Sequence, residues 1–371
     1  MQKVAIIGGG ASGLVCAIEI MKTVKNRDDV KVTVIEKLPR VGKKILVTGN
    51  GRCNLTNMNS ASSGFRGDTD FAYAVLNKYT PESNIEFFNE MGLYTRVEDE
   101  GRVYPLSNQA SSVLDALRFE CDRLGVEVVC DYNVVHVKSV FNGVVQKLVI
   151  NNKDRFDYVV IASGGKAAKV HGTDGDSYDL LKMVGHKINP IAPALVSLNC
   201  DNFTKALKGV RSICKMDLII DGEKVLENYG EVQFTDYGLS GIPIMQLSRF
   251  VSMSPSEDIS INIDVTPDFS LDAISNYLFD RREYGTGLCE NVLIGVMNKQ
   301  LCITLLKECG IAPNGKISEL SDGEILKLEN LCKCWNIKIK TARGFDFAQV
   351  TAGGADCSQF NSETMESKLV E

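Results

Sequence analysis

Residues 4–20, VAIIGGGASGLVCAIEI, decide how the rest of the chain can fold. The apolar run at residues 4–7 is typical of a buried parallel strand. The pattern G-x-G-x-x-G follows it at the start of a helix, with glycines at Gly8, Gly10 and Gly13. A second apolar run, residues 31–35, ends at Glu36, close to the spacing of the acid that binds a ribose hydroxyl in dinucleotide-binding βαβ units.

Each glycine of this turn has its own physical role. Gly8 permits the tight turn, Gly10 lets a diphosphate approach the backbone, and Gly13 lets the helix pack closely on the strand. Ala11 and Ser12 begin the helix, whose N-terminus binds anions. Because the strand, helix, second strand and terminal acid all occur in order, the sequence predicts a dinucleotide site rather than a plain βαβ turn.

The composition is that of a globular protein that handles small molecules. The chain has 371 residues, which favours two or three domains, with 44% hydrophobic and 24% charged residues. Its net charge of -6 argues against a nucleic-acid surface, which normally needs a basic stripe. Nucleic acid is therefore an unexpected partner.

The twelve cysteines are scattered, which indicates reduced thiols rather than a disulfide framework. The three histidines lack a metal-ligand spacing, so no metal is expected. The first strand leaves no room for a signal segment, and no apolar run of about 18 residues could span a membrane. The expected location is the cytoplasm.

The loop at residues 37–57, KLPRVGKKILVTGNGRCNLTN, combines glycines with positive charge beside the predicted site. Its cations are Lys37, Arg40, Lys43, Lys44 and Arg52. Because these cations lie next to the predicted diphosphate site in the sequence, a ligand-binding role is favoured. The alternative is a solvated basic loop.

This loop also carries a resemblance. GGGASG with Glu36, followed by TGNGRCNLTN at residues 48–57, resembles bacterial FAD-dependent flavoproteins of the aminoacetone-oxidase-like type, also described as NAD(P)/FAD-dependent oxidoreductases, with a glutathione-reductase-like two-dinucleotide-binding fold. Matching segments run along nearly the whole chain: ASGG at 162–165, DGDSYDLLKMVGH at 174–186, PALVSL at 193–198, GEVQFTDYGLSGIP at 230–243 and VTAGG at 350–354.

The resemblance implies FAD as cofactor and extends the expected site beyond the glycine turn. It brings residues of the 37–57 loop toward the flavin, a backbone contact near Val134 to the adenine, and the loop after strand 157–162 against the cofactor. The cofactor-binding residues expected in all are Gly8, Gly10, Ala11, Ser12, Gly13, Glu36, Lys37, Lys44, Asn50, Gly51, Arg52, Cys53, Asn54, Val134, Ala162, Ser163, Gly164 and Gly354.

From about residue 191 the pattern changes to short β-rich runs and then helical runs, among them one at residues 292–309. The predicted fold class is α/β: a Rossmann-like FAD-binding domain with an inserted β-rich, barrel-like domain that carries a helical subdomain. The expected FAD-binding domain is discontinuous, residues 1–190 with 341–371, and the insert spans residues 191–340.

The expected function is oxidation of a small molecule, such as the amine aminoacetone, by hydride transfer to flavin N5, with oxygen or NAD(P)H as redox partner. The sequence assigns no catalytic residue firmly; Arg52 and Asn54 are weak candidates, and Arg52 could instead fix the loop by ion pairing. Cys53 is expected to pack rather than react. The alternatives are an NAD(P)H-dependent flavin reductase and a non-catalytic or regulatory dinucleotide-binding protein.

One departure from the resembling proteins concerns the C-terminal end. Those proteins continue with an apolar strand, a G-[ED] motif and a glycine-rich segment over the flavin, whereas this sequence stops at TMESKLVE. The expectation is weakened flavin retention.

Overall fold

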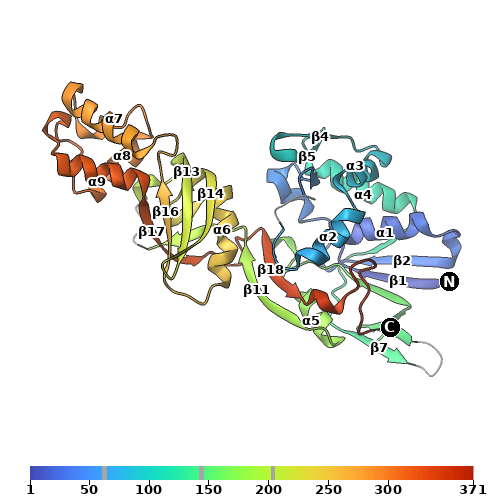
Figure 1. Ribbon diagram of the computed structural model, residues 1–371. Coiled ribbons are helices and arrows are strands. Elements are labelled where there is room, and N and C mark those ends of the chain that lie inside the picture. Colours follow the sequence, from blue (N-terminus) through green and yellow to red (C-terminus); the bar gives the residue numbers. More distant parts are fainter. Residues whose placement is uncertain (61–64, 142–145, 202–204, 371) are drawn as a thin grey trace. The chain divides into compact units, whose positions relative to one another are not determined.

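The computed structural model describes residues 1–60, 65–141, 146–201 and 205–370. The chain forms two compact units, residues 1–191 with 353–371, and residues 192–352 (Figure 1). The chain passes between them through β11 (Ile188–Ala194) and β18 (Val350–Ala355), which pair as a two-stranded sheet.

A parallel sheet forms the centre of the first unit. Its strands lie in the order β10 (Tyr158–Ile161), β1 (Gln2–Ile7), β2 (Val30–Ile35) and β6 (Glu127–Val129). Alternate residues of β1 enter two different cores, Ile6 with Leu14 and Ile18 on one face and Ala5 with Ile150 and Leu180 on the other. Because both faces are covered, the strand is apolar throughout rather than alternating.

Helices α1 (Ala11–Thr23) and α4 (Ala110–Arg123) bury their apolar sides in the first of these cores, and α5 (Asp176–Met183) contributes Leu180 to the second. The other elements of the first unit are α2 (Thr69–Lys78), α3 (Pro81–Glu90), the three-stranded sheet of β3 (Thr56–Asn57), β5 (Arg102–Pro105) and β4 (Thr95–Val97), and that of β7 (Val137–Phe141), β8 (Gln146–Ile150) and β9 (Asp154–Phe156).

The second unit is built on a closed six-stranded barrel (Figure 1). Around it the strands are β12 (Leu198–Cys200), β15 (Gly238–Ser240), β14 (Glu223–Phe234), β13 (Arg211–Ile220), β16 (Ile259–Asp264) and β17 (Trp335–Ala342). Buried and partly exposed residues alternate along β16, as closure with an inward and an outward face requires. The predicted α/β class with a barrel-like insert is therefore confirmed.

The helices of this unit are α6 (Ile242–Met253), α7 (Leu271–Tyr284), α8 (Lys299–Glu308) and α9 (Asp322–Lys333). The helical run predicted from residue 292 begins later, at Lys299, because Asn298 caps the helix there: its side chain accepts a hydrogen bond of 2.8 Å from the N–H of Gln300.

The alternation of β16 gives a stability prediction. Ile261 is fully buried, so Ile261→Ala should lower the free energy of unfolding by about 2–5 kcal/mol through lost burial and a residual cavity. Ser260→Ala, on the outward face of the same strand, should cost less than about 1 kcal/mol. Fluorescence of Trp335, the single tryptophan, reports unfolding of this unit in urea. Equal losses in the two variants would contradict the assigned faces.

Candidate dinucleotide site

The turn between β1 and α1 is held by close backbone packing. Gly8 has a φ of +111°, and a Cβ on it would lie 2.5 Å from the carbonyl oxygen of Ala162, at the end of β10. A Cβ on Gly13 would lie only 1.9 Å from the carbonyl oxygen of Gly8. Both positions therefore require glycine, one for the turn against β10 and the other for the approach of α1 to the turn.

Gly10 is different, because no protein atom lies within 4 Å of a Cβ placed on it. Gly10 is the N-cap of α1 with ordinary extended dihedral angles, so neither strain nor a neighbouring residue explains the glycine. It lines a cavity instead. The open space lies at the helix N-terminus, where unpaired N–H groups favour an anion.

Glu36 follows β2 directly and closes the turn from the other side. Its carboxylate accepts a hydrogen bond of 2.8 Å from the N–H of Gly9 and one of 2.9 Å from the N–H of Leu38. These bonds fix the carboxylate at the cavity, and its remaining lone pairs can accept hydrogen bonds from a ribose.

The cavity has a volume of about 580 Å³, within the range of small-molecule and cofactor sites of roughly 300–1,000 Å³. The hydroxyl of Ser163, on its wall, is buried without a hydrogen-bond partner in the described part of the chain. Burying a hydroxyl without a hydrogen-bond partner costs free energy, and a bound ligand that forms a hydrogen bond with it removes this cost. The open N-terminus of α1, the fixed carboxylate and this hydroxyl together fit a dinucleotide.

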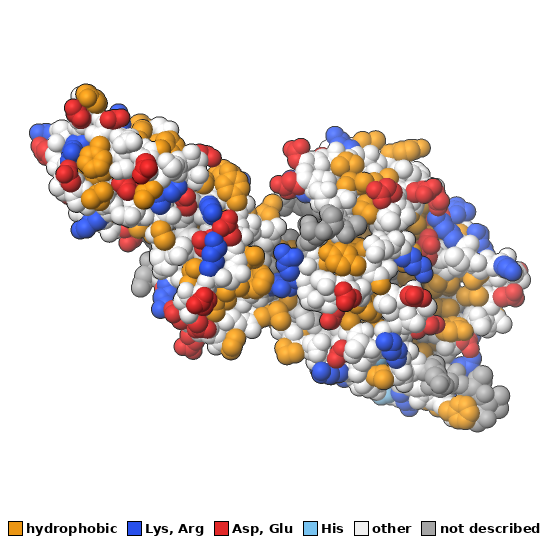
Figure 2. Space-filling model, in the orientation of Figure 1, with side chains coloured by type: hydrophobic (Ala, Val, Ile, Leu, Met, Phe, Trp, Pro, Cys, Tyr) orange, Lys and Arg blue, Asp and Glu red, His pale blue; other side chains and the backbone are white. Residues whose placement is uncertain are grey.

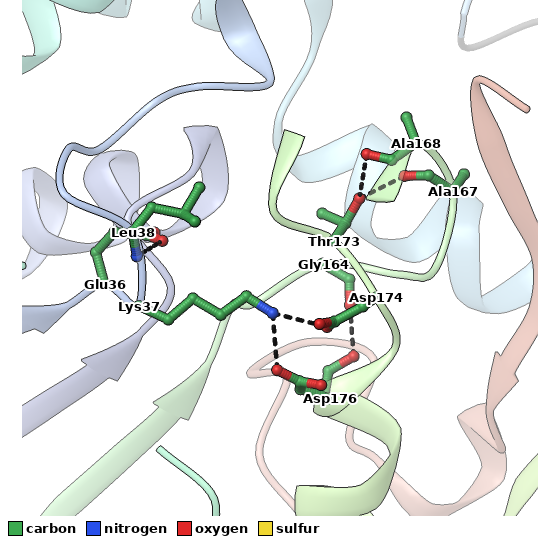
Figure 3. A network of polar contacts seen from close by, with 10 residues as sticks. Glu36, Lys37, Leu38, Gly164, Ala167, Ala168, Thr173, Asp174 and Asp176 are labelled. Atoms are coloured by element: carbon green, nitrogen blue, oxygen red, sulfur yellow. Dashed lines mark hydrogen bonds and ion pairs between the residues drawn. The ribbon is translucent and has the colours of Figure 1, made fainter. Parts of the chain in front are cut away.

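Lys37 forms an ion-pair network across one side of the cavity (Figure 3). Its ammonium lies 2.7 Å from Asp174 Oδ1 and 2.8 Å from Asp176 Oδ2, just before and within the first turn of α5. Burial acts to lower the pKa of Lys37, but the hydrogen bonds to the two carboxylates outweigh it and raise the pKa. The ammonium of Lys37, which was expected to contact the cofactor, is thus already paired with two carboxylates of the protein.

Hydrogen bonds also join residues within the segment 164–177, which carries these carboxylates. Figure 3 shows those made by Thr173. The Thr173 hydroxyl donates to the carbonyl oxygen of Ala167, and the Ser177 hydroxyl donates to that of Gly164. These bonds shape the wall that follows β10.

Arg52 forms an ion pair, as in the alternative role of fixing its loop that the sequence left open. Its guanidinium pairs with Glu98, donates to Asn108 Oδ1 at 2.8 Å, and stacks on the ring of Tyr104 at 3.9 Å. Arg52 is not among the residues that line the cavity within the described chain. Its position favours fixing the loop over acting on a ligand.

Lys44, by contrast, lines the cavity and is partly buried. Its ammonium donates to the carbonyl oxygen of Ala167 at 3.2 Å, and burial lowers its pKa. Cys53 also lines the cavity, where burial raises the pKa of its thiol and so favours an unreactive, packed side chain. Asn54, the other weak catalytic candidate, lines the cavity, and with its amide oriented to satisfy both groups it donates to the carbonyl oxygens of Val103 and Thr56.

The structure brings most of the expected residues to this cavity. On its lining are Gly8, Gly10, Ala11, Ser12, Glu36, Lys37, Lys44, Cys53, Asn54, Val134, Ala162, Ser163 and Gly164, while Gly13 packs behind the turn. In the described residues Asn50, Gly51, Arg52 and Gly354 lie off the lining; a Cβ on Gly354 would instead lie 3.3 Å from the ring of Tyr178.

Sequence reasoning missed an apolar part of the lining, formed by Val15, Ile45, Leu55, Phe88, Val113 and Leu117. The helical spacing of Phe88 in α3 and of Val113 and Leu117 in α4 predicts core positions. Nothing in that pattern separates a core residue from one that lines a cavity in the core.

Over the described ranges, no group of histidine, cysteine or acidic side chains could hold a metal ion. None of the described helices is long and apolar enough to cross a membrane.

The sheet, the glycine turn and the cavity at the helix N-terminus define a dinucleotide-binding protein of the Rossmann type. Over residues 2–371 the chain matches the HI0933-like protein Rossmann domain, and it belongs to this family. The family supports FAD as the dinucleotide of the site, as the resemblance implied.

Relatives match along almost the whole chain. The chain is 36% identical to the 3-dehydro-bile acid delta(4,6)-reductase of Clostridium scindens, over 100% of this chain and 91% of that protein. It is 26% identical to the ribosomal RNA dihydrouridine synthase of Haemophilus influenzae, over 98% of this chain and 88% of that protein. For the ribosomal RNA dihydrouridine synthase of Escherichia coli the identity is 25%, over 98% and 88%.

The open space at Gly10 gives the first prediction for the site. Gly10→Val should fold normally, because no protein atom opposes the new side chain, but should lose FAD by obstructing the diphosphate. Gly323→Val is the matched control, since Gly323 also has open space around it and no positive φ. Flavin absorbance after gel filtration is the measurement. Full flavin occupancy in Gly10→Val would overturn the assignment of residues 8–13.

The Lys37 network gives a second prediction, on pH. Burial acts to raise the pKa of Asp174, but its hydrogen bonds with Lys37 and Asp176 lower it below the ordinary 3.8, whereas the pKa of Lys37 is raised above 10.5. The network therefore stabilises the fold between these two values, and its contribution disappears as the pH falls through the lowered pKa of Asp174. Lys37→Met should cost about 1 kcal/mol at neutral pH, a value reduced by partial exposure.

Urea unfolding of the apoprotein, followed by circular dichroism, measures this cost at neutral and acidic pH. Lys316→Met, which removes an exposed pair with Glu319, should change the stability by about 0–0.5 kcal/mol at either pH. A cost of Lys37→Met that persists unchanged in acid would contradict the account.

Proposed function

We propose that the protein is a FAD-dependent reductase that saturates a carbon–carbon double bond conjugated to a carbonyl group in a small molecule. The chemistry shared by its relatives carries the proposal. One is named for reducing the delta(4,6) double bonds of a 3-dehydro, that is 3-oxo, compound, and the others for making dihydrouridine. Both names describe addition of hydrogen across a double bond that a ring carbonyl activates.

The balance of this reaction sets what the protein must supply. The substrate gains a hydride at the carbon β to the carbonyl and a proton at the α carbon, and NADH or NADPH serves as the external hydride donor. When bound, FAD carries the two electrons between donor and substrate. The chain must therefore hold the cofactor at the glycine turn, offer an apolar surface to the substrate and exclude water.

The lining of the cavity favours a substrate without a positive charge. Among the described residues its lining carries two carboxylates: Glu36, which is placed for the ribose of the dinucleotide, and Asp176, which is paired with Lys37. An ammonium group such as that of aminoacetone would need a carboxylate to pair with. The apolar residues Val15, Phe88 and Leu117 instead offer contact to a hydrocarbon ring.

The charge of the protein favours a free small molecule over ribosomal RNA. The net charge is -6. Basic side chains of the second unit pair with acids, including Lys208 with Asp236, Arg211 with Glu231 and Lys333 with Asp264. Surfaces that bind nucleic acid normally present unpaired lysines and arginines to the phosphates.

The test uses the FAD-loaded protein under anaerobic conditions with NADH or NADPH and either 2-cyclohexenone or a 3-oxo-4-ene steroid. The conjugated absorbance of the enone should decay with one equivalent of nicotinamide oxidised. Gly10→Val should show no turnover, and Gly323→Val should match the unaltered protein.

Two further substrates separate the rival functions. Peroxide release from aminoacetone in air, without enone reduction, would replace the proposal with the amine oxidation that the sequence suggested. Dihydrouridine formation in unmodified ribosomal RNA, again without enone reduction, would instead assign to this protein the function of its 26% identical relative. Silence with all three would favour a binding or regulatory role.

A further inference from the structure

Lys44 differs from Lys37 and Arg52, the paired cations of its loop, in having no carboxylate partner within the described residues. Lys37 is bound by two aspartates and Arg52 by Glu98. The ammonium of Lys44 donates instead to a neutral group, the carbonyl oxygen of Ala167, at 3.2 Å. It therefore brings an uncompensated positive charge to the wall of the cavity.

Partial burial makes this charge effective. Lys44 is partly buried, and burial lowers its pKa, so the protein itself disfavours the charged form. A desolvated ammonium is stabilised strongly by a nearby anion because the local dielectric screens the pair weakly. The position thus favours a ligand that carries or acquires a negative charge.

Lys44 is held by other elements than those that form the expected diphosphate site. The glycine turn and the N-terminus of α1 provide N–H groups for the diphosphate. Lys44 lies at the start of the 3-10 segment Ile45–Gly51, and its ammonium is tied to the wall after β10 through Ala167. The ammonium therefore lies against the wall that follows β10.

We propose that Lys44 supplies the positive charge that stabilises the negative charge gained by the flavin when it is reduced. The inference rests on the proposed function, in which a nicotinamide donor reduces the flavin by two electrons and the substrate then accepts them. Lys44 acts here as a positioning charge, which sets how readily the bound flavin is reduced. Arg52, a catalytic candidate of the sequence, is less suited to this role because Glu98 neutralises its charge.

The test is the midpoint potential of bound FAD, measured with a reference dye, together with the affinity for oxidised FAD. Lys44→Met should weaken binding of reduced FAD at least tenfold more than binding of oxidised FAD. For a two-electron couple a tenfold difference corresponds to a potential about 30 mV lower. Lys44→Arg, which keeps the charge, should restore most of the loss.

The controls are Lys316→Met, which removes an exposed cation that does not line the cavity, and Arg52→Met, which removes the cation paired with Glu98. Neither should change the potential, and circular dichroism checks that all variants fold. Equal losses of oxidised and reduced FAD binding in Lys44→Met would overturn the inference and assign Lys44 to the diphosphate. Complete loss of oxidised FAD in Lys44→Met and Lys44→Arg alike would also overturn it.

These outcomes are independent of the substrate. A potential that depends on the charge at Lys44, in a protein that reduces no enone, would keep the inference and reject the proposed function. An unchanged potential in a protein that does reduce enones would do the reverse.

Discussion

The close contact between Gly13 and the carbonyl of Gly8 is the constraint on which the first unit depends. A single additional carbon at Gly13 would stand 1.9 Å from that oxygen, so α1 can begin at this point only because the residue is glycine. The same turn presses Gly8 against Ala162 at the end of β10. Two strands and a helix thereby meet at one point, with the open N-terminus of α1 facing the space that remains.

The other walls of the cavity follow from what this turn leaves unsatisfied. Glu36 accepts the N–H groups of Gly9 and Leu38, which ties the end of β2 to the turn. Lys37 then pairs with Asp174 and Asp176 and ties the same strand end to α5. Each connection joins segments far apart in the sequence, and each places polar groups at the carboxyl ends of parallel strands, where such folds bind their ligands.

The sequence predicted the parts of this site that local spacing determines. The glycines, the acid after the second strand and the buried character of both strands all follow from patterns within the first 36 residues. The barrel class was also predictable, because short β-rich runs recur after residue 191. By contrast, the partner of each charged side chain depends on contacts across the fold. Glu98 pairs with Arg52, and Asp174 and Asp176 pair with Lys37. Lys44 has no carboxylate partner in the described chain. No spacing within the 37–57 loop distinguishes these three cations.

The central claim is that the cavity at the β1–α1 turn is built for FAD and serves a reductase. The most direct measurement is the stoichiometry and identity of the dinucleotide bound to the purified protein after titration with FAD, determined by absorbance and by mass spectrometry of the released cofactor. The account predicts one FAD per chain, bleached by NADH or NADPH under anaerobic conditions. Failure to bind FAD at saturation, or release of a different nucleotide, would contradict it.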